Sequence, residues 1–250
     1  MKATQLISRQ MKKFGLGITQ NQKYDIQTSR IMRTVLRPDS NCLDVGCFEG
    51  EMLEQMIKFC PRGKHHAFEP IPPKFNALDR KFNHISNVTV HHCALAAEDG
   101  EAEFNYVISN PAYSGLVKRS YDRPNEKDET IRVPTYRLDT LVGPDYTVDF
   151  LKIDVEGGEM GVFNGGQNLI RRSSPIVVFE SGIGGTNHYG TTPEMIFDFL
   201  TSCGLELNTM KGWLAAEAPF SESDFLDQFN NHLNYYFIAH PKGRNRASYL

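Results

Sequence analysis

The sequence predicts an α/β protein with a largely parallel sheet and helices on both of its faces. Apolar residues in the runs 148–155 and 175–179 are dense enough for strands that are buried on both faces, as in a parallel sheet. Helix-like stretches separate the strand-like ones, which is the rhythm of βαβ units. Carboxylates follow several predicted strands, namely Asp44, Glu69, Asp154, Glu156 and Glu180. Because open α/β sheets bind ligands at the carboxyl ends of their strands, we expect a site there.

The size and composition of the chain favour one α/β domain with additions. The chain has 250 residues, of which 40% are hydrophobic, and a net charge of -3. That charge disfavours nucleic-acid binding through a large basic surface. No stretch has the length of a membrane span, and the N-terminus lacks the pattern of a secretory signal. Since the five cysteines form no CxxC pair, we expect a cytoplasmic protein with reduced cysteines.

Three parts are predicted along the chain. Residues 1–37 are expected to be a helical segment that covers the sheet, because an apolar stripe at helical spacing follows Asp25; a lid over the site is the less favoured alternative. Residues 38–240 are expected to form the sheet domain. Residues 241–250 are polar and basic, which predicts a flexible tail.

The first strand, at 41–46, leads into a glycine turn that ends at Gly50 and then into a helix over 51–59. Glycine allows a tight turn and lets a ligand approach the main chain. Asp44 stands two residues before the first glycine, Gly46. A carboxylate at this position can face a cationic ligand group, such as the amino group of a bound amino-acid moiety.

The second strand, at 64–68, ends at Glu69. The spacing from Gly46 to Glu69 is about that of the acidic residue that binds ribose hydroxyls in nucleotide-binding βαβ units. One carboxylate can accept hydrogen bonds from two hydroxyls. Glu69 is therefore predicted to contact a ribose.

The rest of the chain continues the alternation with one interruption. A polar insert at 109–129 is long enough to be functional rather than a simple link. Further strands are predicted at 87–93, 101–108, 131–141, 148–155 and 175–180, with an antiparallel edge pair at 205–210 and 233–239. Helices are predicted at 158–170 and from Thr192 to Gly204. Acids beside a helix start also act as caps, so Asp154 and Glu156 have that alternative role.

Several motifs carry a resemblance to a known family. They are Leu43-Asp44-Val45-Gly46 with Gly50, Phe68-Glu69-Pro70, Leu138-Asp139-Thr140-Leu141, Lys152-Ile153-Asp154-Val155-Glu156-Gly157, and Phe179-Glu180. In this order they resemble the FkbM family of S-adenosylmethionine-dependent methyltransferases, over about residues 40–181. The resemblance implies a class I, Rossmann-like methyltransferase fold with a largely parallel seven-stranded sheet. It also implies cofactor contacts from Asp44, Gly46, Cys47, Phe48, Gly50, Glu69, Pro70, Cys93, Ala94, Leu95 and Asp154.

Two positions depart from the family pattern. The family's first loop usually reads Gly-Ala-Asn-x-Gly, but Phe48 stands where the asparagine amide would form hydrogen bonds. Ala96 and Ala97 stand where the family often has Ser-Asp. A polar contact to adenine is therefore expected from the backbone, from Glu98 or from Asp99.

The resemblance implies methyl transfer from S-adenosylmethionine to a hydroxyl oxygen of a small-molecule or carbohydrate acceptor. Asp154 and Glu156 are the first candidates for the acceptor-side base, and Glu180 is a further one. His188, in a polar loop, is a weaker candidate. Carboxylates of this kind can hold Mg²⁺ or Ca²⁺, but no spacing demands it, so no metal is predicted. No nucleic-acid or membrane partner is expected, and the sequence leaves the oligomeric state open.

Three alternatives remain beside this hypothesis. Asn110-Pro111-Ala112-Tyr113 resembles the Asn-Pro-Pro-Tyr signature of adenine-N6 methyltransferases, without its second proline. An NAD-dependent oxidoreductase is disfavoured because the loop is G-x-x-x-G and no Tyr-x-x-x-Lys pair exists in the chain. The third alternative is a non-catalytic module that binds a nucleotide without turnover.

Overall fold

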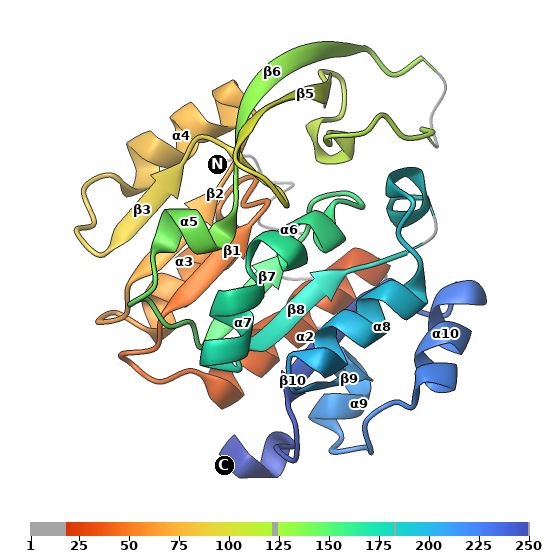
Figure 1. The fold of residues 1–250 in the computed structure, drawn as a ribbon. Helices are drawn as coiled ribbons and strands as arrows, with labels where there is room; N and C mark the ends of the chain where they lie inside the picture. The colour runs from red at the N-terminus through yellow and green to blue at the C-terminus, as the bar shows by residue number, and fades with distance from the viewer. Residues whose placement is uncertain (1–18, 122–124, 183, 250) are drawn as a thin grey trace.

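The protein is built on a twisted main sheet, with a smaller sheet projecting from one end (Figure 1). The computed structural model describes residues 19–121, 125–182 and 184–249. Its strands are β1 (Cys42–Val45), β2 (His65–Phe68), β3 (Val88–His91), β4 (Ala94–Leu95), β5 (Gly100–Val107), β6 (Asp128–Tyr136), β7 (Phe150–Ile153), β8 (Ile176–Glu180), β9 (Leu205–Thr209) and β10 (Tyr236–Pro241). Its helices are α2 (Gln20–Val35), α3 (Glu51–Phe59), α4 (Pro72–Phe82), α5 (Leu138–Val142), α6 (Glu159–Gly165), α7 (Gln167–Ser173), α8 (Pro193–Ser202), α9 (Met210–Leu214) and α10 (Glu222–Asn230). Short 3-10 turns are η1 (Pro111–Tyr113), η2 (Thr186–Tyr189) and η3 (Arg246–Tyr249).

The main sheet has seven strands in the order β3-β2-β1-β7-β8-β10-β9. All neighbours are parallel except β10, which runs antiparallel to both β8 and β9. The predicted parallel sheet with an antiparallel edge is thereby confirmed. Val45 pairs with Phe68 on one side and with Ile153 on the other, so these strands end together. Their carboxyl ends therefore meet at one edge of the sheet, where a ligand is expected.

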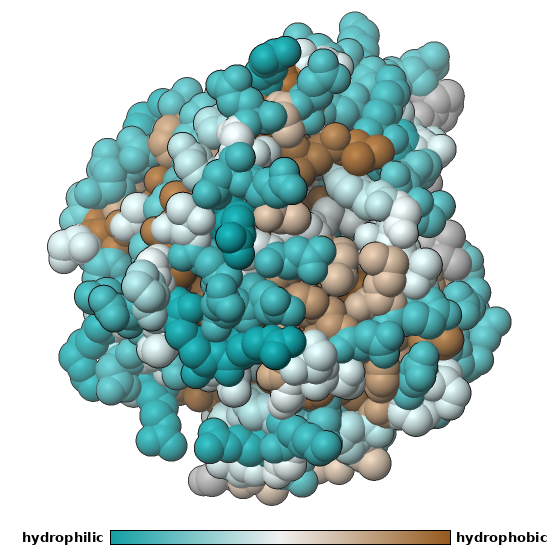
Figure 2. Space-filling view, in the orientation of Figure 1, coloured by the Kyte–Doolittle hydropathy of each residue, from teal (hydrophilic) through white to brown (hydrophobic). Residues whose placement is uncertain are grey.

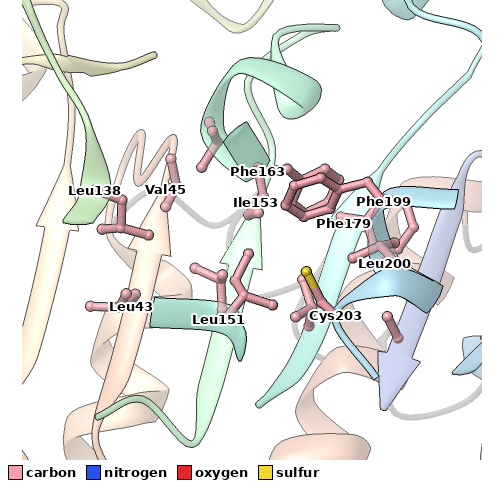
Figure 3. Packing of buried hydrophobic residues seen from close by; sticks show 14 of the residues in the cluster. Leu43, Val45, Leu138, Leu151, Ile153, Phe163, Phe179, Phe199, Leu200 and Cys203 are labelled. Atoms are coloured by element: carbon pink, nitrogen blue, oxygen red, sulfur yellow. The ribbon is translucent and has the colours of Figure 1, made fainter. Parts of the chain in front are cut away.

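Side chains of the central strands point alternately to the two faces of the sheet, and both faces are buried under helices. Leu43, Val45, Leu151 and Ile153 point to the face that α6, α7 and α8 cover (Figure 3). Cys42 and Phe150 belong to the cluster on the opposite face, which is covered by α2, α3 and α9. Since β1 and β7 are buried at every position, their apolar runs lack the alternation of a half-exposed strand.

Helix α2 lies on the sheet face that carries the polar side chains of the site. Thr19 caps its start in a reciprocal capping box with Gln22. Its buried stripe includes Tyr24, Ile31 and Met32, which pack in the second cluster. The predicted cover segment 1–37 is described only from residue 19, and residues 1–18 lie outside the described part of the chain.

A three-stranded sheet, in the order β4-β6-β5, interrupts the βαβ rhythm and rises above the main sheet in Figure 1. The extended segment predicted at 131–141 is wrong in its last part, because β6 ends at Tyr136 and α5 follows. Asp99 is the physical reason, because its carboxylate accepts hydrogen bonds from the Arg137 amide (2.6 Å) and the Thr140 hydroxyl (3.0 Å). These bonds give donors in the first turn of α5 a partner.

The C-terminal third contains helices that the sequence did not indicate. Short α9 and amphipathic α10 both went unpredicted, and the helix expected at 158–170 is divided at Gly166. In the predicted tail, Arg246 donates to the Leu214 carbonyl (2.8 Å), and the Tyr249 ring lies 6.0 Å from that of Trp213. The flexibility of this segment stays a prediction.

Figure 2 shows one face on which polar residues predominate and hydrophobic residues are interspersed among them. Among the described helices, none combines the length and the hydropathy that a membrane span requires.

Candidate active site

A cavity of about 430 Å³ lies at the carboxyl ends of β1, β2, β7 and β8. Most of the residues that were predicted to contact the cofactor or the acceptor line this cavity. Those that line it are Asp44, Gly46, Cys47, Phe48, Glu69, Pro70, Cys93, Ala94, Leu95, Asp154, Glu156 and Glu180. Of the predicted site residues, Gly50 and His188 are not among its lining.

Gly46 brings the turns after β1 and β7 into direct contact. It has a φ of +74°, and a Cβ atom at this position would lie 1.8 Å from the Asp154 carbonyl oxygen. A side chain would therefore push apart the two strands whose ends form the site. The requirement for glycine here is steric and conformational at once.

Gly50 has a packing role instead of the predicted ligand contact. It caps α3 with a φ of +77°, and a Cβ atom there would lie 2.8 Å from both Leu78 and Phe82. These two side chains belong to α4. The second glycine of the turn thus serves the packing of two helices, and this accounts for its absence from the cavity wall.

Glu69 organises the glycine turn from inside the cavity. Its two oxygens accept hydrogen bonds from the backbone amides of Phe48 and Ile71, both at 2.9 Å, and the residue is 3% exposed. Burial raises the pKa of Glu69 to about 7, although the two amides counteract this rise. Phe48, which replaces the family's asparagine, uses its own backbone amide here, and the Lys74 ammonium lies 3.6 Å from its ring centroid.

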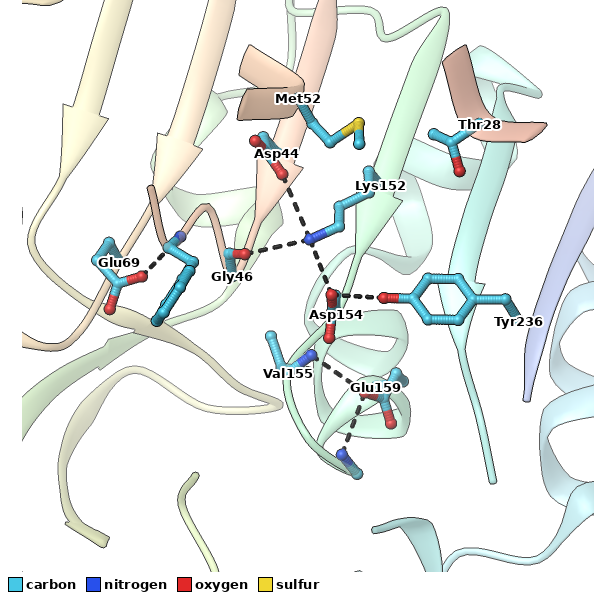
Figure 4. A network of polar contacts seen from close by, with 12 residues as sticks. Thr28, Asp44, Gly46, Met52, Glu69, Lys152, Asp154, Val155, Glu159 and Tyr236 are labelled. Atoms are coloured by element: carbon cyan, nitrogen blue, oxygen red, sulfur yellow. Dashed lines mark hydrogen bonds and ion pairs between the residues drawn. The ribbon is translucent and has the colours of Figure 1, made fainter. Parts of the chain in front are cut away.

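Lys152 joins the two ends of the cavity (Figure 4). Its ammonium lies 3.7 Å from Asp44, 3.2 Å from Asp154 and 3.2 Å from the Gly46 carbonyl oxygen, to which it donates. Burial would lower the pKa of Lys152, but the carboxylates of Asp154 and Asp44 raise it above its ordinary value. A single buried cation therefore holds both acids in place.

Asp44 is a buried carboxyl with unused capacity. It is 1% exposed, and neither of its oxygens has a hydrogen-bond partner among the described residues. Burial raises its pKa, while Lys152 lowers it. The Cys47 thiol and the Leu53 amide also counteract the rise, but neither contact has the geometry of a hydrogen bond. The unused oxygens fit a ligand that brings its own donors.

Asp154, Glu180 and Tyr236 form a polar row across three adjacent strands. Glu180 pairs with Tyr236 in the β8–β10 ladder, and the Tyr236 hydroxyl donates to Asp154 at 2.5 Å (Figure 4). Burial opposes the ionisation of Asp154, but Lys152 and hydrogen bonds from Glu180 and Tyr236 lower its pKa overall. Burial and the neighbouring Asp154 raise the pKa of Glu180 well above its ordinary value. The pair is thus arranged to share one proton.

Glu156 stands on a strained turn at the far end of this row. It is a non-glycine residue with a φ of +57°, and it forms an ion pair with Arg119 from the polar insert. Burial and Asp154 raise the pKa of Glu156 to about 8, against the lowering effect of Arg119. Oxygens of Glu156, Asp154 and Glu180 lie within 4.8 Å of one another. Tyr236 and Arg119 contact two of these carboxyls, so a cation here would bind through the lone pairs that these contacts leave.

Several sequence predictions fall outside this arrangement. Asp99, expected near the adenine, instead holds the start of α5, and Glu98 is exposed away from the cavity wall. His188 is exposed, while its neighbour Tyr189 lines the cavity and accepts a hydrogen bond from the Val117 amide at 3.1 Å. Tyr189 is therefore the residue by which this loop reaches the site.

Four site residues were missed because their sequence context gives little signal. They are Tyr24, Arg119, Tyr189 and Tyr236, from α2, the polar insert, the 181–190 loop and β10. Lys152 was recognised within a motif but given no role. Its position offered a signal, since a lysine inside an otherwise apolar, fully buried strand requires paired acids nearby.

The comparisons with known proteins point to one family of methyltransferases. A family model described as Methyltransferase FkbM domain matches residues 44–207. Methyltransferase 1 of Beauveria bassiana (strain ARSEF 2860) is 29% identical over 145 residues, which are 51% of this chain and 58% of that protein. The 2-O-methyltransferase NoeI of Sinorhizobium fredii (strain NBRC 101917 / NGR234) is 22% identical over 179 residues, 67% of this chain and 74% of that protein. The crystal structure of Methyltransferase FkbM from Methylobacillus flagellatus KT aligns with a TM-score of 0.49 and 14% identity, over 82% of this chain and 44% of that one.

The mostly parallel sheet with its antiparallel edge is that of a class I methyltransferase. Enzymes of this fold generally use S-adenosylmethionine. Because the family model matches well over half of the chain, the chain belongs to the FkbM methyltransferase family. The resemblance drawn from the motifs is confirmed. The chain spans only 58% of the Beauveria relative, so the acceptor is a matter for proposal.

Proposed function

We propose that the protein transfers a methyl group from S-adenosylmethionine to a hydroxyl oxygen of a small-molecule or carbohydrate acceptor. The observation that carries this proposal is the single cavity wall that runs from Glu69 and Asp44 to Asp154 and Glu180. The end with Glu69 and Asp44 suits the nucleoside and the amino-acid group of the cofactor. The end with Asp154 and Glu180 offers carboxyls to the hydroxyl of the acceptor. NoeI, named as a 2-O-methyltransferase, supports oxygen as the acceptor atom.

The cofactor end fits S-adenosylmethionine in three respects. The unpartnered oxygens of Asp44 suit the cofactor's ammonium group, and Glu69 lies where a ribose is expected. Cys93, Ala94 and Leu95 are buried and line the same cavity, and they suit the apolar faces of an adenine. Glu69 already accepts two backbone amides, so a ribose would use the remaining lone pairs of its oxygens.

The acceptor end supplies the acid–base chemistry. Bound S-adenosylmethionine supplies an electrophilic methyl group on a sulfonium. We assign Glu156 as the base that takes the hydroxyl proton, because a pKa of about 8 lies near the working range of a general base. Asp154, fixed by Lys152 and Tyr236, orients the site, and Glu180 shares its proton with Asp154 beside the acceptor. Asp154, first on the list of sequence candidates, is the weaker base because its pKa is lowered.

The alternative functions find less support. The segment Asn110-Pro111-Ala112-Tyr113 follows β5 of the small sheet, whereas an adenine-N6 signature belongs at the end of a core strand. Pro111 and Ala112 do line the cavity, but as part of its rim. The glycine turn and Glu69 would also admit a dinucleotide, so NAD remains the control ligand.

The test is ligand-dependent melting followed by turnover. S-adenosylhomocysteine at saturating concentration should raise the melting temperature, because a ligand that binds only the folded state stabilises it. NAD should give no shift. Stabilisation by NAD alone would refute the cofactor assignment. Labelled methyl transfer from S-adenosylmethionine to one hydroxyl compound, located by NMR on oxygen, would then establish the reaction.

A further inference from the structure

A second cavity, of about 270 Å³, adjoins the first. The two cavities share Asn21, Glu156 and Glu180 as lining residues. The carboxyls assigned to the acceptor are therefore reached from two sides, by the cofactor cavity and by this one. Neither Asp44 nor Glu69 lines the second cavity, so it is separate from the nucleoside end.

Three segments that are distant in the sequence build the second cavity. The polar insert contributes Tyr113 and Arg119, the loop after β8 contributes Gly182 and Gly185, and the segment between α10 and β10 contributes Asn234 with its neighbours. The last segment carries none of the motifs that define the family.

Unused polar groups stand in the wall of this cavity. Arg119 pairs with Glu156 through its terminal nitrogen, but its buried Nε has no partner among the described residues. Glu159 is 0% exposed, and its Oε2 likewise has no described partner, while its Oε1 accepts the amides of Val155 and Gly157, both at 3.2 Å. Buried groups of this kind are costly unless a ligand satisfies them.

Aromatic rings complete the wall. The Arg119 guanidinium lies 4.7 Å from the Tyr113 ring centroid, and the Tyr235 ring lies 4.8 Å from that of Tyr24. Flat rings beside hydrogen-bonding groups suit a molecule with both apolar faces and many hydroxyls. The lining has three carboxyls, on Glu156, Glu159 and Glu180, against one guanidinium. Since the pKa values of Glu159 and Glu156 are about 7 and about 8, both are ionised above pH 8, where the wall disfavours an anionic molecule.

We propose that the second cavity is the acceptor subsite and that it takes an uncharged polyhydroxy compound, with Arg119 and Tyr235 setting specificity. This inference rests on the proposed function. The reacting hydroxyl lies between Glu156 and Glu180, at the shared wall. Its oxygen forms a bond to the methyl carbon, the carbon–sulfur bond breaks, Glu156 takes the proton, and S-adenosylhomocysteine leaves.

The experiment measures binding of defined probes at pH 9, where Glu156 and Glu159 are ionised, to the full chain saturated with S-adenosylhomocysteine. The neutral probes are the methyl glycosides of glucose, galactose, mannose, xylose and rhamnose, and the anionic probe is methyl glucuronide. Saturation-transfer NMR should detect at least one neutral glycoside, with the glucuronide bound about tenfold more weakly or worse. Absence of binding by every neutral glycoside, or equal binding of the glucuronide, would overturn the proposal.

Two variants and two matched controls assign the binding to this cavity. Arg119→Gln and Tyr235→Ala should each lower the affinity for the bound glycoside by about fivefold or more, because each removes a wall group that contacts the ligand. The control variants Arg132→Gln and Tyr136→Ala, at exposed positions on β6, should leave the affinity for the glycoside unchanged. Equal affinities in all four proteins would place the probe elsewhere and refute the assignment.

Two readouts separate this inference from the proposed function. Affinity for S-adenosylhomocysteine should be the same in all four variants, since neither Arg119 nor Tyr235 lines the cofactor cavity. If the unmodified protein does not bind S-adenosylhomocysteine, the cofactor assignment itself is refuted. Retained affinity with no glycoside bound would refute only the acceptor subsite. For a probe that is methylated, the two variants should raise KM more than they lower kcat.

Discussion

The two halves of the site are built in different ways. The cofactor half comes from consecutive motifs between Asp44 and Leu95, in which each residue stands at or just beyond the end of a strand. The acceptor half joins Arg119 to Glu156 and Tyr236 to Asp154, which are 37 and 82 residues apart in the chain. Local backbone geometry therefore fixes the first half, and tertiary packing fixes the second.

The largest expected effect comes from Gly46, where the backbones of the two halves touch. Gly46→Ala should cost more than about 3 kcal/mol of unfolding free energy, because its Cβ would overlap the Asp154 carbonyl. Gly204→Ala is the matched control: it has a φ of +81° but open space around it, so it should cost only about 1 kcal/mol. Urea unfolding measures both. Equal losses would mean that backbone conformation alone, and not contact between the halves, requires glycine at Gly46.

The next effect should be confined to the acceptor half. Glu156→Gln should lower kcat by about 10²- to 10⁴-fold, since it removes the proposed base, and should leave the affinity for S-adenosylhomocysteine unchanged. A base works in its ionised form. The unmodified enzyme should therefore gain rate as pH rises through the pKa of Glu156, about 8, and this limb should vanish in the variant. Glu98→Gln, at an exposed position, is the control.

A different outcome would reassign the base. If Glu156→Gln retains the rising limb of the pH profile, the proton acceptor is the Asp154–Glu180 pair. Loss of cofactor affinity together with kcat would mean that the two halves are not independent, and the comparison between them would then fail.

The sequence predicts which residues of the cofactor half line the cavity, and it does so for a physical reason. The positions of Asp44, Gly46 and Glu69 follow from strands that end together and from a turn that only glycine can make. The same reasoning misplaces Gly50, because a glycine required for helix packing has the same appearance in a sequence as one required for a ligand. Asp99 fails similarly, since capping and ligand binding both use acids.

The acceptor half could be predicted only where it follows a core strand. Asp154, Glu156 and Glu180 are strand-end acids and were identified, whereas Tyr236 stands at the start of an antiparallel strand. Its neighbours in the sequence give no sign that β10 inserts beside β8. Arg119 lies in a loop whose course depends on its partners. Contacts between residues that are distant in the chain can be assigned only once the fold is known.

A smaller effect compares one buried acid from each half. Glu69 and Glu159 both have a pKa raised to about 7 by burial, and both accept two backbone amides. Glu69 uses both oxygens, whereas Glu159 uses only one. Glu69→Gln should therefore cost about 1–3 kcal/mol at pH 8, because its amide NH₂ would face a backbone N–H. Glu159→Gln should be neutral or stabilising, because the NH₂ replaces the unpartnered oxygen.

The pH dependence of stability checks the sign of this comparison. A carboxyl whose pKa is raised in the folded state keeps its proton while the unfolded chain loses it, so stability falls as pH rises from about 4.5 to about 7. Each such group contributes up to about 3 kcal/mol to that fall. Glu159→Gln should flatten the curve of unfolding free energy between pH 5 and 8. An unchanged slope would show that Glu159 is ionised throughout, and a slope change with exposed Glu101→Gln would point to an indirect effect.

The smallest expected effect concerns Tyr236, whose place in the site has no signal in its sequence context. Tyr236→Phe removes one hydroxyl that donates to Asp154, and should cost about 1 kcal/mol of unfolding free energy. Tyr146→Phe removes a comparable bond, to the Lys64 carbonyl at 2.8 Å and far from the site, so it should cost the same. Only Tyr236→Phe should change turnover, by less than about tenfold, because Lys152 still holds Asp154 ionised. If both variants leave turnover unchanged, Tyr236 packs the acceptor half without tuning it, and the polar row works through Lys152 alone.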